Sequence, residues 1–584
     1  MARVETTTPL PKDMPPPMPR HGWVAIGLVL VAAFMQLVDV SIVNVAVTEI
    51  QRGLGADYTQ IQWVLAGYTL AFAVLLVASG RMGDRIGRKR VFLIGMSAFT
   101  VASLLCGVAQ NPEMLVGSRL LQGLAAALMY PQVYSVIQVT VPVKQRGAVL
   151  GVLGGVIGLA AITGPLVGGL LIQTNLFHWG WRPIFLVNVP IGLLTVLLAL
   201  RFLPESRADE ADPIDWAGVV LITLSVGLLV YPLVEGRDLG WPRWLFGLLA
   251  AGALGLLLFA AHELRRERTG RTPLIRMSLF ANRGFSGGLL LVVLFYGAFL
   301  PFFLVFSVYA QAGLGYTALQ TGVTLVPYAF GSGLGSGASI ALASRLGRSI
   351  LHIGLLLLIA GTCWITWTVH HHGSDLHRLQ MLAPLLAAGL GFGLTVTPLV
   401  TLILAKVPLR HAGSASGTLT TAQQFGSAVG IALLGSLFFG LLGTHANTVT
   451  DRQSATLIQK LTAAGMPAPQ ADRAVAAFKQ CFHDRASEKD STVMPASCRS
   501  AAPASGSHSG KAAQSPAAKK INNILADTAT RARHTDFAWS AERTLYVQIG
   551  AFGVCLVLVW LLPKVRGKEL AEFEEQSQET VIIG

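Results

Sequence analysis

The stretch FMQLVDVSIVNVAV, residues 34–47, lies inside an apolar run long enough to cross a membrane, and it contains an acidic side chain, Asp39. A carboxylate at bilayer depth costs about 3 kcal/mol on insertion scales, so such a residue marks a functional site by default. Thirteen further apolar runs follow along the chain. The sequence therefore predicts an all-α polytopic membrane protein, with Asp39 as the first candidate for its chemistry.

The composition supports this fold class. Of the 584 residues, 13% are charged, about half the fraction usual in soluble proteins, 53% are hydrophobic, and the mean hydropathy is +0.58. The formal charge of +14 comes from short basic clusters between apolar runs, which indicates membrane topology and argues against a nucleic-acid partner. Five cysteines without CxxC or His/Cys metal spacing exclude a disulfide framework, and we expect no metal site.

We expect transmembrane helices near residues 23–50, 60–80, 91–110, 113–140, 147–173, 183–203, 214–234, 244–263, 284–311, 319–342, 350–370, 379–405, 413–443 and 541–562. Lys and Arg concentrate in the loops after even-numbered helices, nineteen against five in the short loops after odd-numbered ones. The positive-inside rule then predicts a multi-pass protein of the plasma membrane with both termini in the cytoplasm. The N-terminal segment lacks the features of a cleavable signal peptide, so we expect an uncleaved signal anchor.

These helices predict seven segments. They are a cytoplasmic tail (1–22), a six-helix bundle (23–203), two extra helices with a cytoplasmic linker (204–282), five helices of a second bundle (283–443), a polar extracytoplasmic loop (444–540), the last helix (541–563) and a cytoplasmic tail (564–584).

Within the predicted polar loop, residues 454–482 are compatible with an amphipathic helix, and residues 487–520 have the composition of disorder. Cys481 and Cys498 share this outer compartment, where a disulfide would survive. The alternative is two unpaired thiols in a loose loop.

An internal repeat suggests two halves. Arg85-Ile86-Gly87-Arg88 follows the second predicted helix, and Arg345-Leu346-Gly347-Arg348 follows the tenth. If the two helices of 204–282 are an insertion, both turns follow the second helix of a six-helix half. Parallel repeats of this kind are one way in which transporters are built.

The loop GRMGDRIGRKR, residues 80–90, carries the strongest local signal for a conformational gate. Its glycines permit a tight reversal and close backbone approach, and its acid suits a local ion pair or a helix N-terminus in the opposite half. The alternative, positive-inside anchoring, explains the bases but not the ordered glycines or the acid. The candidate gating residues are Gly80, Gly83, Asp84, Arg85, Gly87 and Arg88.

This loop resembles the signature loop of the major facilitator superfamily. LVDVSIVNVAV (37–47), RLLQGLAAA (119–127), GVLGGVIGLAAITGPLVGG (151–169) and WRPIFLVNVPIG (181–192) resemble motifs of its fourteen-helix drug:proton antiporter branch, and HAGSASGTLTTAQQFGSAVG (411–430) resembles the penultimate-helix region. Thr48 stands where a proline is usual, and Ala160 where a glycine is usual. The resemblance implies the major facilitator fold, two six-helix bundles plus two extra transmembrane helices.

The resemblance implies that Asp39 and Arg119 take part in proton coupling. At 1.5 Å rise per residue, Asp39 lies about 16 Å inward from the outer end of its helix, and Arg119 about 10 Å inward from the outer end of the fourth helix, so an arginine side chain can span the difference. A proton on Asp39 would discharge it and release its partner. The alternative is a fixed structural salt bridge.

Gly164, Pro165, Gly168 and Gly169 give the fifth helix a bend and a bare face, which suits close helix packing in lipid. The resemblance implies that this motif accompanies export by exchange, and a plain packing motif is the alternative. Polar candidates for lining a substrate cavity, each of which could instead bond a neighbouring helix, are Gln36, Asn44, Gln122, Gln132, Gln423 and Gln424.

The sequence thus predicts a proton-coupled antiporter that exports amphipathic, cationic or neutral lipophilic drugs by alternating access. No GxxxxGK[ST] motif occurs, so we expect no cofactor, no enzymatic activity and a drive from the proton gradient. Expected partners are lipophilic substrates, protons and membrane lipids, with a monomeric chain and a periplasmic adaptor only in a Gram-negative host. The alternatives are a same-fold exporter dedicated to one metabolite, siderophore, lipid or peptide, and a membrane receptor or interaction module that uses residues 444–540.

Overall fold

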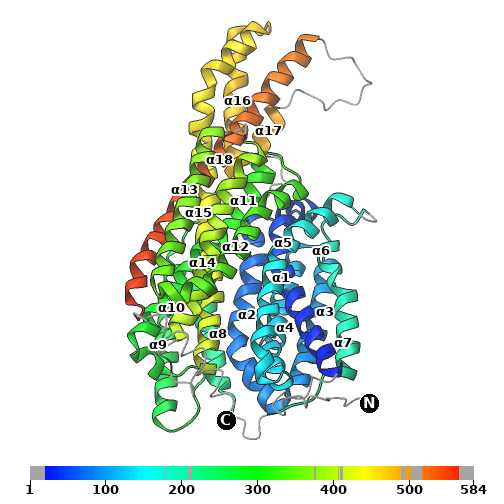
Figure 1. Cartoon of the computed structure of the whole chain (residues 1–584). Coiled ribbons are helices and arrows are strands. Elements are labelled where there is room, and N and C mark those ends of the chain that lie inside the picture. Colours follow the sequence, from blue (N-terminus) through cyan, green and yellow to red (C-terminus); the bar gives the residue numbers. More distant parts are fainter. Residues whose placement is uncertain are drawn as a thin grey trace, which may run out of the picture.

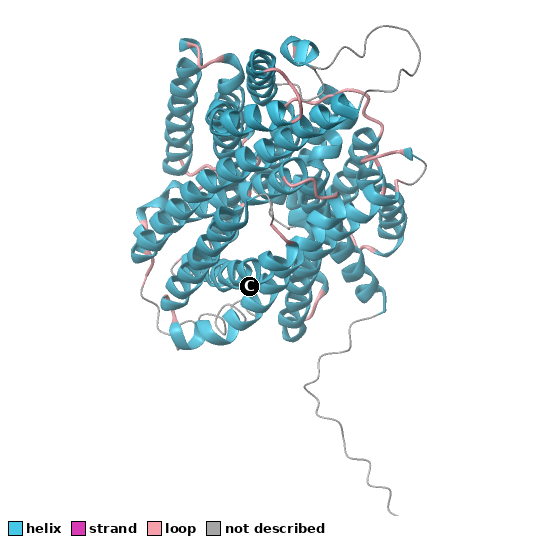
Figure 2. Cartoon of the chain, turned by 90° about the horizontal axis from the view of Figure 1, so that it is seen from above, coloured by secondary structure: helices cyan, strands magenta, loops and turns pink. Residues whose placement is uncertain are grey.

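The computed structural model describes residues 20–175, 178–207, 213–373, 376–404, 407, 412–487, 495–501 and 516–563. These residues form helices joined by short turns, with no strand among them (Figures 1 and 2). The described chain begins and ends at the same end of the helical body, here called the terminal end. The opposite end carries a helical projection formed from residues 444–487, 495–501 and 516–540 and is called the extension end (Figure 1).

The first half comprises α1 (Arg20–Leu54), α2 (Tyr58–Ile86), α3 (Arg88–Gly107), α4 (Pro112–Thr140), α5 (Val143–Thr174), and α6 (Pro183–Leu186) with α7 (Asn188–Phe202). Capping side chains mark where two of these helices begin. The Asp57 side chain caps α2 and accepts from the backbone N–H of Gln60. The Asn111 side chain caps α4, which begins at a proline. The short turns that result make consecutive helices antiparallel, and the closest packing is between α1 and α5, α2 and α4, and α3 and α4.

The insertion comprises α8 (Trp216–Leu239) and α9 (Arg243–Arg268), followed by the short helix η2 (Met277–Ala281). Helix α8 packs between α2 of the first half and α15 of the second. The Trp63 indole N–H donates to Glu235 at 2.8 Å, and Ser436 donates to the Leu233 carbonyl at 3.1 Å. The two extra helices therefore lie at the side of the body, as predicted, and α8 contacts both halves.

The second half comprises α10 (Arg283–Phe299), α11 (Pro301–Val308) and η3 (Tyr309–Gly313) as one bent rod, α12 (Ala318–Leu346), α13 (Ser349–His372), η5 (Arg378–Met381) with α14 (Leu382–Leu404), α15 (Ala412–Ala463), and α18 (Pro516–Leu558) with η7 (Val559–Leu561). By length and hydropathy, 12 helical segments of the described chain can cross a membrane. Helices α5 and α12, with 32 and 29 residues, are also long enough. Both lie at the places of the fifth and tenth spans that the sequence predicts.

The two RxGR turns occupy equivalent places in the two halves. Gly87 ends α2 with φ 115°, and Gly347 ends α12 with φ 52°, a backbone region that favours glycine. The Arg88 backbone N–H donates to the Ser206 carbonyl at 3.0 Å, just beyond α7, and the Arg348 guanidinium donates to the Leu562 carbonyl at 2.8 Å, just beyond α18. Each turn thus rests on the end of the sixth helix of its own half, which supports the internal repeat.

Most of the described part of the predicted polar loop at 444–540 is helical. Helix α15 continues to Ala463, α16 (Ala468–Ser487) and α17 (Ala496–Ala501) follow, and α18 begins at Pro516 rather than near 541. Leu457, Leu461 and Val475 form a small core with Ile521 and Leu525. Spaced apolar residues within a polar composition make helices that pack together, so overall polarity is a poor guide here. The amphipathic helix predicted at 454–482 forms with a break at 464–467, and the described residues of the segment predicted to be disordered, 487–520, include α17 and the start of α18. Residues 488–494 and 502–515 lie outside the described chain.

A disulfide joins Cys481 of α16 to Cys498 of α17. Beside it, the Ser497 hydroxyl donates to Asp484 at 2.6 Å and, together with Gln480, lowers the pKa of that carboxyl. A cross-link across 17 residues stabilises a fold by about 3 kcal/mol.

We therefore expect Cys498→Ser to raise the rate of amide hydrogen exchange in α16 and α17 without changing exchange in the membrane-crossing helices. Cys363→Ser, which removes an exposed free thiol, is the matched control. Unchanged protection of α16 in Cys498→Ser would show that the disulfide does not hold the extension together.

Candidate functional site

The predicted pair of buried charges meets inside the first half. Asp39 of α1 and Arg119 of α4 have 0% and 1% of their side chains exposed, and Arg119 Nη1 lies 2.6 Å from Asp39 Oδ2. Removing one partner of such a buried pair typically destabilises a protein by about 3–5 kcal/mol, because the other charge stays buried and uncompensated. Loss of either Asp39 or Arg119 is therefore expected to destabilise the first half.

Two amides complete the surroundings of the Asp39 carboxylate. Gln122 Nε2 and Asn188 Nδ2 donate to Oδ1 at 2.8 and 3.1 Å. Asn188 is the first residue of α7, directly after the break between α6 and α7. Asp39 thus accepts from three donors on two other helices.

The same network fixes Arg119. Its Nε donates to the Val64 carbonyl of α2 at 3.1 Å, its Nη1 also donates to Gln122 Oε1 at 2.7 Å, and its guanidinium lies 4.1 Å from the centre of the Tyr68 ring. The Ser103 hydroxyl of α3 accepts from the amides of Gln122 and Asn188. Helices α1, α2, α3, α4 and α7 are therefore linked by one set of polar contacts, so a change of charge at Asp39 affects the packing of the whole half.

Asn188 and Ser103 were not among the predicted site residues. An asparagine within IFLVNVPIGLL, two residues before a proline that favours a helix start, was a usable signal for Asn188. A serine in an apolar helix is common, so Ser103 gave no comparable signal.

Replacing Asn188 by Ala removes one of the three donors to Asp39, and a hydrogen bond to a charged group contributes about 1.5–3 kcal/mol. We expect transport driven by a pH gradient to fall about tenfold. Thr195→Ala is the control, because Thr195 lies on the same helix as Asn188 and its hydroxyl donates to the Ile191 carbonyl of that helix. Equal transport rates in the two variants would exclude a role for Asn188.

The predicted cavity residues lie in several environments. Gln122 belongs to the Asp39 network, Gln36 donates to the Tyr68 hydroxyl at 3.1 Å, and Gln132 donates to the Ser79 carbonyl at 3.0 Å. Gln423 and Gln424 are half-buried on α15. The first three therefore bond neighbouring helices, and a role of the set in lining a cavity stays a prediction.

The segment predicted as a loop, residues 80–90, is mostly helical: α2 continues to Ile86, Gly87 makes the turn and α3 begins at Arg88. Asp84 forms an ion pair with Arg88 at 2.9 Å, so it is paired locally rather than with the opposite half. Gly83 packs against the Gln132 amide, whereas Gly80 has open space around its Cα, and Arg85 is exposed. Arg81, the residue after Gly80, donates to the carbonyls of Pro273 and Leu274 in the linker before α10.

The small residues of α5 face both halves. Gly164 and Gly168 pack against Ser41 and Ile42 of α1. Gly169 faces α12, where a Cβ would lie 2.5 Å from the Leu319 Cα, and the Pro165 carbonyl packs against Gly322 of α12. This face of α5 is therefore a direct contact between the halves near the extension end.

Further contacts between the halves lie near the same end. Gln311 Nε2 of η3 donates to the Val45 carbonyl of α1 at 2.8 Å, and the rings of Tyr58 and Phe439 stack with centroids 4.0 Å apart. The halves thus pack against each other at the extension end.

Comparison with known proteins identifies the family. The profile described as Major Facilitator Superfamily matches residues 29–431. A "Probable actinorhodin transporter" of Streptomyces coelicolor is 39% identical over 554 residues, 94% of this chain and 93% of that protein. The "Multidrug resistance protein Stp" of Mycobacterium tuberculosis is 31% identical over 440 residues, 75% of this chain and 79% of that protein. A crystal structure of a bacterial homolog of the human lysosomal transporter Spinster, in an inward-facing and occupied conformation, has a TM-score of 0.56 at 14% identity and covers 93% of this chain and 97% of that one. This chain therefore belongs to the Major Facilitator Superfamily, among its drug efflux transporters, and is a multi-pass protein of the plasma membrane rather than an enzyme.

Proposed function

We propose that this transporter exports amphipathic, cationic or neutral lipophilic compounds in exchange for protons, by alternating access of its two halves. The observation that carries the proposal is the buried pair of Asp39 and Arg119, because it places a carboxylate that can bind a proton inside the membrane-spanning part of the first half. An ionisable residue inside a membrane-spanning bundle typically belongs to a proton or ion pathway.

Protonation of Asp39 would remove the counter-ion of Arg119 and the shared acceptor of Gln122 and Asn188. The energy involved, about 3–5 kcal/mol for a broken buried pair, is close to the ~5.5 kcal/mol that moves a two-state equilibrium from 1:99 to 99:1. A single proton is therefore sufficient in magnitude to change which arrangement of the halves is preferred.

The excess of basic residues in the loops at the terminal end favours a cytoplasmic location for that end. With the halves packed together at the extension end, the present arrangement would be the one that receives substrate from the cytoplasm. Proton entry from the outside would accompany release of substrate in the opposite arrangement.

The test is transport into proteoliposomes with an acidic lumen, using a permanently charged fluorescent cation such as ethidium. A permanent charge prevents passive trapping by the pH gradient, and protein-free vesicles are the control. We expect accumulation that collapses when nigericin removes the pH gradient. Accumulation that persists after nigericin would contradict proton exchange.

A second candidate is a transporter of the same fold dedicated to one compound. The relative named for a single compound matches along 94% of this chain, whereas the multidrug relative matches along 75%. Competition against ethidium by a panel of unrelated drugs distinguishes the two functions, since broad competition supports multidrug export and competition by one compound class supports the dedicated exporter.

A further inference from the structure

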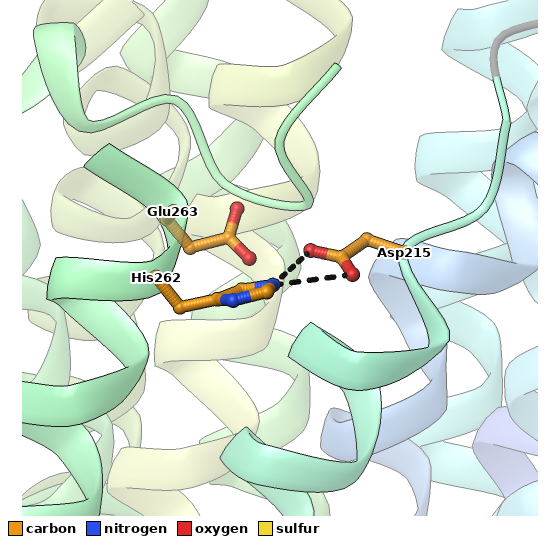
Figure 3. A group of neighbouring side chains, drawn as sticks. All are labelled: Asp215, His262 and Glu263. Carbon is orange, nitrogen blue, oxygen red and sulfur yellow. Dashed lines mark hydrogen bonds and ion pairs between the residues drawn. The ribbon is translucent and has the colours of Figure 1, made fainter. Parts of the chain in front are cut away.

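The terminal end of the inserted hairpin carries a cluster of side chains that the transport mechanism does not use. Asp215 is the N-cap of α8, and His262 and Glu263 lie near the end of α9. One ligand atom from each lies within 4.8 Å of the others, and in the described part of the chain no second group of three His, Cys, Asp or Glu side chains meets this criterion. Figure 3 shows the three side chains pointing toward one another from the two helices.

Three neighbouring residues hold the Asp215 carboxylate in place. Its Oδ1 accepts from the Gly218 backbone N–H at 3.1 Å, and its Oδ2 lies 3.1 Å from His262 Nε2 and 3.2 Å from Arg266 Nε. Arg266 also donates to the Thr272 carbonyl at 3.2 Å, so it is anchored independently of Asp215. The charge of Asp215 is balanced by Arg266.

Glu263 is the side chain whose contacts are incomplete. It has 0% of its surface exposed, its Oε2 accepts from the Ile275 backbone N–H at 3.0 Å, and its Oε1 has no hydrogen-bond partner. Buried carboxylate oxygens are normally paired, so an unpartnered one requires a positive partner or a proton.

The unpartnered oxygen faces Asp215. A Cβ on Gly218 would lie 2.5 Å from Glu263 Oε1 and 2.6 Å from Asp215 Oδ2, so both oxygens approach the same bare stretch of α8. Two carboxylate oxygens and an imidazole nitrogen converge here, with one arginine to balance two negative charges. The second negative charge is neutralised either by a cation or by a proton on Glu263, and the two cases give different results in the test below.

We propose that Asp215, His262 and Glu263 bind a divalent transition-metal ion, with Zn²⁺ as the probe. The ligand atoms would be Asp215 Oδ2, the unprotonated Nε2 of His262 and Glu263 Oε1. Zinc binds such N and O donors at about 2.0–2.2 Å, so atoms already within 4.8 Å of one another need only small side-chain rotations to share one ion. The imidazole favours Zn²⁺ over Mg²⁺ and Ca²⁺, which prefer oxygen ligands alone.

The surroundings suit such a site. His262 is 31% exposed, so the ion can be reached from the surface and can keep a water as its fourth ligand. Glu263 also holds the backbone of Ile275, next to Leu274, whose carbonyl binds Arg81 of the first half. A bound ion would therefore fix α8, α9 and the linker together at the point where the linker contacts α2.

Sequence spacing could not have predicted this site, since Asp215 and His262 are 47 residues apart and the adjacent pair of His262 and Glu263 matches no metal motif. The proposal does not depend on the transported substrate or on proton coupling.

The test uses the full-length protein in detergent, purified without a histidine tag, stripped with a chelator that is then removed, and titrated with Zn²⁺ against a chromophoric competitor. We expect one saturable Zn²⁺ per chain that millimolar Mg²⁺ does not displace. Glu263→Gln and Asp215→Asn are each expected to weaken binding at least about tenfold. Asparagine remains a good N-cap, so Asp215→Asn should keep α8 folded, and thermal unfolding of each variant checks this.

Two matched control variants leave the three proposed ligands unchanged. Glu267→Gln changes a carboxyl one turn further along α9, and His371→Gln changes one of three consecutive histidines at the end of α13 that could bind Zn²⁺ separately. Both should retain the tight ion. X-ray absorption should show a single imidazole and oxygen ligands at about 2.0–2.2 Å. Failure of the wild type to retain Zn²⁺, as expected if Glu263 carries a proton instead, or equal affinity in Glu263→Gln, would overturn the proposal.

Discussion

Asp39→Asn is expected to abolish accumulation of substrate driven by a pH gradient while leaving exchange of labelled for unlabelled substrate measurable. Asparagine has nearly the size of aspartate and can accept a hydrogen bond from Arg119, but it cannot bind and release a proton. Loss of proton-driven accumulation with retained exchange would separate coupling from substrate binding. Proteoliposome uptake under a gradient and in its absence measures both.

The loss of charge at Asp39 also leaves Arg119 buried without its counter-ion, which is expected to destabilise the protein by about 3–5 kcal/mol. The double variant Asp39→Asn with Arg119→Gln removes both charges and should recover stability without recovering coupling. Glu49→Gln, near the end of the same helix, is the control and should transport normally. Accumulation at the wild-type level in folded Asp39→Asn would dismiss the assigned role.

Gly169→Ala is expected to reduce transport at least about tenfold by preventing the contact between α5 and α12. The added Cβ would lie 2.5 Å from the Leu319 Cα, and a main-chain atom cannot move aside as a flexible side chain can. Overpacking of this kind typically destabilises a structure by about 1–3 kcal/mol. Here it destabilises the arrangement in which the halves meet at the extension end.

The matched control is Gly155→Ala on the same helix, because a Cβ there would meet no atom within 4 Å. Spin labels on α5 and α12 near the extension end should report a longer distance in Gly169→Ala and an unchanged distance in Gly155→Ala. Normal transport by Gly169→Ala would mean that the close contact at this glycine is not needed for the transport cycle.

The bilayer explains why so much of the fold could be predicted. Each crossing needs about 20 apolar residues in a helix that satisfies its own backbone, so hydropathy alone indicated the spans. The same rule could not predict the break at Pro301 or the helices beyond the membrane. In the extension, packing depends on spaced residues such as Leu457, Leu461 and Val475 within a polar sequence.

Some residues of the candidate site could likewise be predicted from the sequence, and others could not. Asp39 and Arg119 were predictable because charges are rare at membrane depth, and their helix positions indicated similar depths. Asn188 could not be assigned a partner, since its contact with Asp39 depends on how α7 begins after the break at Val187. The cluster of Asp215, His262 and Glu263 forms because α8 and α9 pack together, and no local sequence pattern predicts that contact.

The most direct test of the account follows the proton itself. A pH-sensitive dye trapped in proteoliposomes with an acidic lumen would report protons leaving as substrate enters. The account predicts substrate-dependent alkalinisation of the lumen with the wild type and with Glu49→Gln, and none with folded Asp39→Asn. Equal substrate-dependent proton movement in wild type and Asp39→Asn would contradict it.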